Sequence, residues 1–165
     1  MNKYVKISLY IFLGIIAWEL LKSLLQVSTD DYIKKEIGVD ISSCSILINN
    51  DTHSGLLGDG DYFAKAKCSD DFIKQLDSWQ ELPLSRNLDL IMYGGYKDRA
   101  YYSYELALDM GIPEIKNGYY LFIDRSDEAT DIHSDEDLFD RYSFNFTIVL
   151  YDTDTNYFYY YEFDT

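Results

Sequence analysis

The carboxyl-terminal segment constrains the fold most strongly. Two runs rich in β-branched and aromatic residues, 143–151 and 157–164, flank the polar segment 152–156. Runs of this composition favour β-strands, and a short polar connection between them favours an antiparallel hairpin. The sequence therefore predicts a C-terminal β-hairpin within an antiparallel sheet.

Hydrophobic periodicity and turn residues predict further elements along the chain. We expect strands over residues 43–49, 61–68, 87–93 and 118–124, helices over residues 28–36, 69–80 and 105–110, and one or two helical turns within residues 134–140. Because helices and strands are interspersed and the strand pairs form hairpins, we expect an α+β fold rather than a doubly wound parallel sheet. The expected domain has an antiparallel sheet of about five or six strands and two to four short helices.

The amino terminus combines a basic start with an apolar segment. Lys3 and Lys6 precede residues 7–25, which are apolar apart from a few polar positions that include Glu19 and Lys22. A helix over this segment is roughly 28 Å long, close to the ~30 Å of a bilayer core. The two charges lie three residues apart near the helix end, where they can pair and lysine can reach the interface.

Three interpretations of this segment remain open. It is a signal anchor that stays in the chain, a cleaved signal peptide that lacks a small-residue cleavage site, or an amphipathic helix packed on the protein's own core. We expect the first, with residues 1–27 forming an N-terminal membrane-spanning helix and residues 28–165 forming one acidic α+β domain. The basic start favours a cytoplasmic amino terminus, so the domain faces outside the cytoplasm of a single-pass membrane protein.

Charge limits the class of partner. The chain has 14 basic and 29 acidic residues, for a net charge of -15. Nucleic-acid binding requires clustered cations, so we expect no nucleic-acid partner. An acidic surface steers cationic partners, so a basic protein is a better fit.

The two cysteines are too few for a disulfide-dense scaffold or a four-cysteine zinc site. Cys44 and Cys68 are equidistant from the middle of the expected loop between strands 43–49 and 61–68. Symmetric antiparallel pairing places them opposite each other, within disulfide range. Outside the cytoplasm the bond forms; the alternative is a pair of buried free thiols.

The loop before the second of these strands is the preferred place for a binding site. It contains His53 and Asp59, is rich in glycine, and is followed by Asp61. Loops at hairpin ends commonly carry function. Asp51, His53, Asp59 and Asp61 are also the groups that a carboxylate-based hydrolase would use, although no motif assigns a catalytic residue here.

Two acidic segments raise the question of calcium. Residues 152–156 match the first ligand positions of an EF-hand loop, but Tyr157 replaces the required glycine. A second acidic stretch, residues 124–140, reads as a solvated loop. We therefore predict no cofactor and no metal ligands, with weak calcium binding as the remaining possibility.

Tyrosine is the compositional outlier, with 17 residues. Tyr157, Tyr159 and Tyr161 share one face of the last expected strand because alternate strand residues point the same way. Tyrosine rings suit protein interfaces and saccharide stacking, or they cover a half-buried sheet.

The function expected from these features is a membrane-anchored binding or accessory domain whose partner is a protein or a wall polymer. The alternatives are a small carboxylate-based hydrolase and a soluble immunity-type protein that binds a basic partner.

Overall fold

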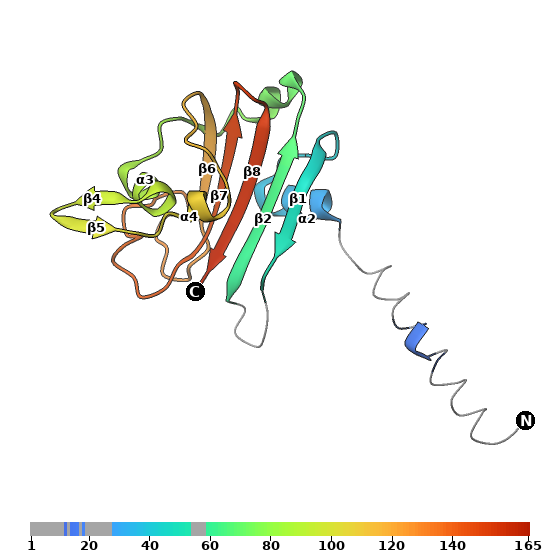
Figure 1. The fold of residues 1–165 in the computed structure, drawn as a ribbon, viewed down its shortest axis with the longest axis horizontal. Helices are drawn as coiled ribbons and strands as arrows, with labels where there is room; N and C mark the ends of the chain where they lie inside the picture. The colour runs from blue at the N-terminus through green and yellow to red at the C-terminus, as the bar shows by residue number, and fades with distance from the viewer. Residues whose placement is uncertain (1–11, 13, 17, 19–27, 54–58) are drawn as a thin grey trace, which may run out of the picture.

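The computed structural model describes residues 12, 14–16, 18, 28–53 and 59–165, and its centre is a six-stranded antiparallel sheet (Figure 1). The strand order is β1-β2-β8-β7-β6-β3, so the C-terminal strand lies inside the sheet beside the second strand of the chain. A second sheet contains only β4 and β5. The expected α+β class and antiparallel sheet are therefore confirmed.

The elements of the described residues are short. The central sheet consists of β1 (Ser45–Asp51), β2 (Gly60–Lys67), β3 (Gln80–Glu81), β6 (Gly118–Asp124), β7 (Asn145–Asp152) and β8 (Tyr157–Asp164). The small sheet consists of β4 (Gly95–Lys97) and β5 (Ala100–Tyr102). The helices are α2 (Thr29–Ile37), the 3-10 helix η1 (Asp70–Gln75), α3 (Arg86–Tyr93) and α4 (Leu106–Asp109).

The predicted C-terminal hairpin is present as β7 and β8. The strands pair in unbroken register from Asn145 opposite Asp164 to Asp152 opposite Tyr157. The Asp152 carboxylate accepts hydrogen bonds from the backbone N–H groups of Asp154 and Thr155, and Asn156 closes the turn with φ 53°. Aspartate and asparagine suit these positions because they bond to nearby backbone and tolerate positive φ.

Side chains that alternate along the strands build a separate core on each face of the sheet. Phe158 and Tyr160 pack with the residues of α2 and η1, whereas Tyr159 and Tyr161 pack with those of α3 and α4. Figure 1 shows α2 behind β1 and β2, and α3 and α4 beside the opposite half of the sheet. The abundance of tyrosine and phenylalanine thus supplies both cores.

Helix α2 begins and ends as its sequence predicts. The Ser28 side chain accepts a hydrogen bond from the Asp31 N–H, and Gly38 adopts φ 74° just past the last turn. Serine at the start and glycine in the left-handed conformation at the end satisfy backbone groups that the helix leaves unpaired. Ile33 is the buried contact of the helix with the sheet.

Residues 87–93 were expected to form a strand, and this prediction is wrong because they belong to helix α3. Ser85 caps this helix by accepting a hydrogen bond from the Leu88 N–H at 3.2 Å. Leu88, Ile91 and Met92 are buried at helical spacing in the core. A short apolar run fits a strand or a helix equally well, and here the tertiary packing decides.

Two further expectations need correction. The helix expected over residues 69–80 is only the 3-10 helix η1, and Gln80 instead begins β3, opposite Tyr120. Residues 134–140 form isolated turns, such as the bond from the Leu138 N–H to the Asp135 carbonyl. In the second segment the Ser134 hydroxyl accepts a hydrogen bond from the Glu136 N–H, which competes with helical hydrogen bonding.

The membrane anchor expected over residues 7–25 lies almost wholly outside the described residues. In the part of the chain that the structure does describe, no helix has the length and apolar character to cross a bilayer.

Candidate functional site

His53 lies between two carboxylates at one end of the sheet. Its Nδ1 is 2.7 Å from an Asp51 oxygen, and its Nε2 is 3.0 Å from an Asp164 oxygen at the end of β8. The other Asp164 oxygen accepts a hydrogen bond from Arg125 at 2.7 Å. The His53 network, defined as Asp51, His53, Asp164 and Arg125, thus joins three segments that are distant in the sequence.

The surroundings of His53 favour its charged form. Burial lowers the pKa of the imidazole, but the hydrogen bonds and charges of Asp51 and Asp164 outweigh burial and raise the pKa above its usual value. Both ring nitrogens are occupied by carboxylates. In this arrangement neither nitrogen is free to take a proton from a nucleophile, so the network acts as an electrostatic tie.

The ring nitrogens of His53 face Asp51 and Asp164, and not the two aspartates nominated with it. Asp61 accepts a hydrogen bond from the buried Tyr161 hydroxyl at 2.7 Å, while Asp59 is exposed just before β2. Burial, together with the bond to Asp61, raises the pKa of Tyr161. The backbone of Asp61 nevertheless packs against that of Thr52, beside His53, at 2.8 Å. The three nominated residues therefore share one end of the sheet, but the side chains of Asp51 and Asp164 are the ones that engage the His53 ring.

The three nominated tyrosines share one face of β8, but most of their surface is covered. Tyr159 and Tyr161 are buried in the core, and only Tyr157 is half-exposed. The rings of Tyr157 and Tyr159 lie 6.2 Å apart. Tyr157 is thus the only one of the three that is partly exposed, and the ammonium groups of Lys65 and Lys67 lie over its ring at 4.4 Å and 4.9 Å.

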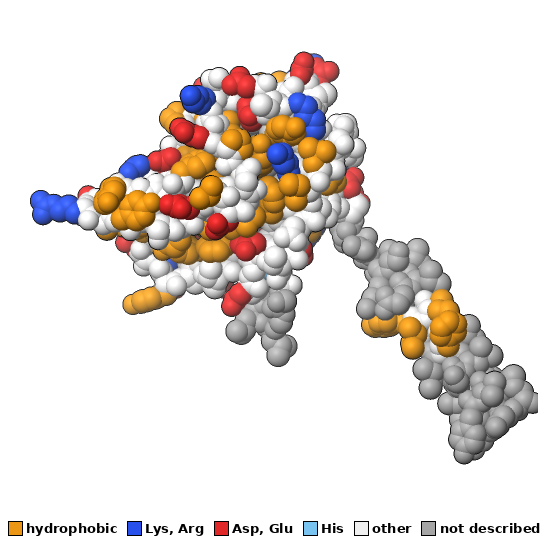
Figure 2. Space-filling model, in the orientation of Figure 1, with side chains coloured by type: hydrophobic (Ala, Val, Ile, Leu, Met, Phe, Trp, Pro, Cys, Tyr) orange, Lys and Arg blue, Asp and Glu red, His pale blue; other side chains and the backbone are white. Residues whose placement is uncertain are grey.

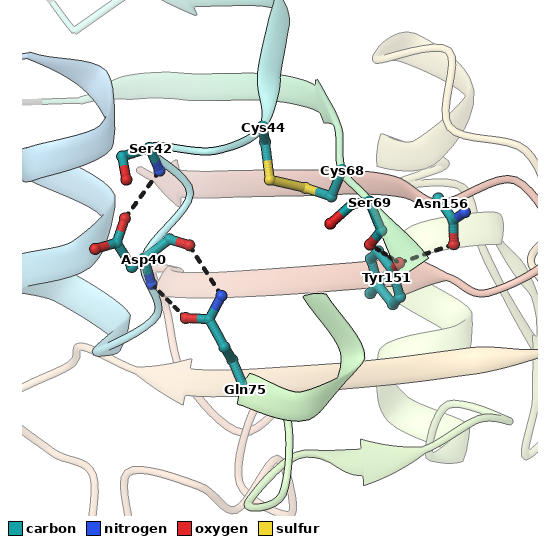
Figure 3. The surroundings of a disulfide bond; sticks show 8 residues. All are labelled: Asp40, Ser42, Cys44, Cys68, Ser69, Gln75, Tyr151 and Asn156. Atoms are coloured by element: carbon teal, nitrogen blue, oxygen red, sulfur yellow. Dashed lines mark hydrogen bonds between the residues drawn. A yellow bond between two sulfur atoms is a disulfide. The ribbon is translucent and has the colours of Figure 1, made fainter. Parts of the chain in front are cut away.

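Cys44 and Cys68 are joined by a disulfide, with their α-carbons 4.3 Å apart (Figure 3). Ser45 lies opposite Lys67, so the two cysteines face each other immediately beyond the paired residues, as symmetric pairing requires. The register shifts between Ile46 and Ile48, and the symmetry ends there. The bond fixes the start of β1 to the end of β2.

Aspartates of the acidic stretch 124–140 bond to other residues of the domain. Asp124, buried at the end of β6, forms an ion pair with Arg141, and Asp135 accepts a hydrogen bond from Ser85. Over residues 28–53 and 59–165, no three histidine, cysteine, aspartate or glutamate side chains are grouped so as to hold a metal ion.

An exposed surface formed by β4, β5 and α4 was not nominated from the sequence. The hairpin of β4 and β5 projects from the body of the domain (Figure 1). Its Tyr96 and Tyr101 rings pack 5.0 Å apart yet remain 70% and 54% exposed, and Leu108 on α4 is 72% exposed. The hairpin surface is defined here as Tyr96, Tyr101 and Leu108 together with Glu105 and Glu114.

Acidic groups and a shallow depression accompany these apolar side chains. The Tyr101 hydroxyl donates a hydrogen bond to Glu105 at 2.9 Å. Glu105, Leu108 and Glu114 line a depression of about 410 Å³. Figure 2 shows hydrophobic side chains gathered over β4 and β5 with acidic side chains beside them.

Tyr93 also lines this depression. Burial, with Glu114 and Asp89 nearby, raises the pKa of Tyr93 to about 12, so its hydroxyl stays protonated and donates to the Pro113 carbonyl. The depression therefore combines apolar walls with two carboxylates, which suits the aliphatic stem and cationic head of lysine or arginine.

Two features of the sequence indicate part of this surface. Tyrosines cluster at residues 101, 102 and 104, and Gly94 and Gly95 mark a break in the chain. The hairpin itself has only three residues in each strand, too few for a period-two pattern to be seen.

No protein-family model matches the sequence, and neither the curated proteins nor the solved structures contain a match.

Proposed function

We propose that this chain is a membrane-anchored binding or accessory domain that faces outside the cytoplasm and recognises a basic protein. The hairpin surface is the recognition site. The observation that carries this proposal is the pair of largely exposed tyrosine rings beside the depression lined by Glu105 and Glu114. Tyrosine is enriched at the energetic centres of protein interfaces, and a carboxylate pair selects cations.

Two observations support the location. Disulfides persist in oxidising compartments, so the Cys44–Cys68 bond fits a domain outside the cytoplasm. The apolar segment of residues 7–25, which follows Lys3 and Lys6, fits a signal anchor. Protease treatment of intact cells with membrane fractionation tests this part: the domain should be digested from outside and found in the membrane fraction.

The charge of the domain supports a basic partner over a neutral polymer. Residues 28–165 contain 11 basic and 28 acidic residues. Such an excess accelerates the approach of cationic proteins, and the effect weakens as salt is raised. Binding should therefore decrease with ionic strength, whereas recognition of an uncharged polymer by aromatic stacking should not.

Site-specific photo-crosslinking in intact cells tests the recognition site. A photo-reactive phenylalanine analogue at Tyr96 should give a discrete adduct with a basic protein. The same analogue at Tyr142, which is exposed on another loop, is the control and should not give that adduct.

A charge variant separates recognition from general attraction. Glu105→Gln/Glu114→Gln should remove the adduct at Tyr96. Asp127→Asn/Glu128→Asn, which removes the same charge from another exposed loop, should retain it. The proposal would be contradicted if the adduct formed in equal yield from Tyr96 and Tyr142. It would also be contradicted if Glu105→Gln/Glu114→Gln left the yield of the Tyr96 adduct unchanged.

A further inference from the structure

The depression on the hairpin surface contains two carboxylates that have no basic partner in the described part of the chain. Glu105 and Glu114 line it together with the apolar side chains of Leu108, Ile112 and Pro113. Within residues 28–53 and 59–165, the ion pairs of lysine, arginine and histidine all involve other acidic residues. The depression therefore offers negative charge and apolar walls to a cation that has an apolar stem.

The backbone of Glu105 has an uncommon conformation. Its φ of 50° and ψ of 34° place it in the left-handed region, immediately before helix α4. Residues other than glycine, asparagine and aspartate rarely adopt this conformation, which persists only where surrounding contacts hold the residue. The contacts of Glu105 therefore determine where its carboxylate lies.

Two contacts hold the Glu105 side chain. The Tyr101 hydroxyl donates a hydrogen bond to Oε1 at 2.9 Å, and this bond raises the pKa of Tyr101, which therefore stays protonated as a donor. On the other side, a Cβ added to Gly94 would lie 2.9 Å from the Glu105 Cγ and 3.2 Å from Oε1, so the side chain lies directly against the glycine backbone. Oε1 is thus engaged within the domain, and Oε2 is the oxygen left for a ligand.

This arrangement distinguishes lysine from arginine. A guanidinium group binds a carboxylate best as a fork, with two parallel hydrogen bonds to the two oxygens of one group. An ammonium group is a compact charge with three donors, which can bond to single oxygens of separate carboxylates. Because Glu105 offers one oxygen and Glu114 supplies the second carboxylate from another segment, the depression suits an ammonium group better.

We infer that the depression binds one lysine side chain of the basic partner, with Glu105 as the specificity-determining residue and Tyr101 as the residue that positions it. The inference rests on the proposed function, because it names the side chain that the hairpin surface recognises. The stem of the lysine lies along Leu108 and Pro113, and its ammonium group donates to Glu105 and Glu114.

Three capped tripeptides are the probes, with lysine, arginine or norleucine between two glycines. Norleucine has the four-carbon stem of lysine without the charge. Amide chemical shifts of the full chain in a mild uncharged detergent measure the affinity for each tripeptide. The lysine tripeptide should bind about three- to tenfold more tightly than the norleucine tripeptide, the gain expected for two exposed ion pairs. It should also bind more tightly than the arginine tripeptide, and the shifts should concentrate over residues 93–114.

Tyr101→Phe tests the positioning role, because it keeps the ring and removes the hydroxyl. It should weaken binding of the lysine tripeptide by about two- to fivefold. It should also reduce the preference for lysine over arginine, because Oε1 becomes free to accept a guanidinium fork. A general loss of structure would weaken both tripeptides alike, so the ratio of the two affinities reports on the position of the carboxylate.

Tyr96→Phe is the matched control. It removes a hydroxyl from the neighbouring ring of the same hairpin, 5.0 Å from that of Tyr101, and should leave both the affinity and the preference unchanged. Glu105→Gln should bring the affinity for the lysine tripeptide close to that for the norleucine tripeptide.

The inference would be overturned by equal affinities of the unaltered chain for the lysine and arginine tripeptides, or by shifts that lie outside residues 93–114. An effect of Tyr101→Phe no larger than that of Tyr96→Phe would also overturn it. These results are distinct from failure of the proposed function, which is shown when no adduct with a basic protein forms at Tyr96 in cells. If that adduct forms and requires Glu105 and Glu114 while the tripeptides are not discriminated, only the lysine inference is overturned.

Discussion

The hydroxyl of Tyr32 lies 3.0 Å from both carboxylate oxygens of Glu162, joining helix α2 to the last strand across 130 positions of sequence. Glu162 is only 2% exposed, and the Tyr160 hydroxyl also donates to it. Burial and the carboxylate raise the pKa of both tyrosines, so both remain donors. A buried carboxylate is tolerated only when such partners replace water.

Tyr32→Phe should destabilise the domain by about 1–3 kcal/mol, because it removes a hydrogen bond to a buried carboxylate that cannot regain water. Tyr142→Phe is the matched control, since Tyr142 is fully exposed and should change stability little. Urea denaturation measures both variants. Equal stability of the two variants would show that the Tyr32 bond contributes nothing.

Removal of the disulfide should cost about 3 kcal/mol, the loop-closure estimate for a loop of this length. The bond spans 24 positions and ties β1 to β2. Cys44→Ser/Cys68→Ser and the reduced wild-type protein should show the same loss in denaturant midpoint. A reduced protein as stable as the oxidised one would contradict the prediction.

The contribution of His53 to stability should depend on pH. Because the pKa of His53 is raised in the folded state, its stabilisation is fully present below the unfolded pKa of about 6.5. It is lost as pH rises through the folded pKa.

Denaturation between pH 5.5 and 8 measures this effect. His53→Asn should therefore be most destabilising at about pH 5.5, with a penalty that shrinks towards pH 8. His133→Asn is the control, because the hydrogen bond that the His133 ring makes within the described residues goes to the Phe122 backbone carbonyl, at 2.9 Å, and not to a carboxylate. A His53→Asn penalty that is constant across this range would refute the electrostatic tie.

Replacing Gly118, at the start of β6, should destabilise the domain far more than replacing Gly38, which follows α2. A Cβ on Gly118 would lie 2.0 Å from the Tyr151 carbonyl oxygen, and the neighbouring β7 backbone cannot move without breaking its pairing. A Cβ on Gly38 meets nothing within 4 Å, so Gly38→Ala adds only the strain of its left-handed backbone, about 1 kcal/mol. Gly118→Ala should lower the thermal midpoint well beyond Gly38→Ala, and equal midpoints would contradict this prediction.

Local sequence patterns were sufficient to predict the elements that several kinds of signal indicate together. The β7–β8 hairpin, the caps of α2 at Ser28 and Gly38, and strand β6 follow from composition, turn residues and periodicity. The facing positions of Cys44 and Cys68 follow from their equal distance to the loop centre. These features depend on interactions between residues that are near in sequence or symmetric about one turn.

The candidate sites could not be predicted from the sequence, because they depend on contacts between residues that are distant in the sequence. His53 meets Asp164 across 111 positions, Tyr32 meets Glu162 across 130, and the loop chemistry around His53 predicted neither contact. The hairpin surface similarly requires α4 and the β4–β5 hairpin to come together. Its depression is lined by residues 93–114, whose tertiary arrangement no periodicity specifies.

The sequence by itself determined the α+β class, the antiparallel hairpins and the acidic charge, because alternation, turn residues and ionisable side chains act locally or add together along the chain. Only the tertiary structure decided that residues 87–93 form a helix, that Tyr159 and Tyr161 are buried, and that β1 is an outer strand of the sheet formed by the described residues. The physical reason is that burial and strand neighbours are properties of the packed sheet. Long-range hydrophobic contacts override the small differences in local propensity that a short apolar run provides.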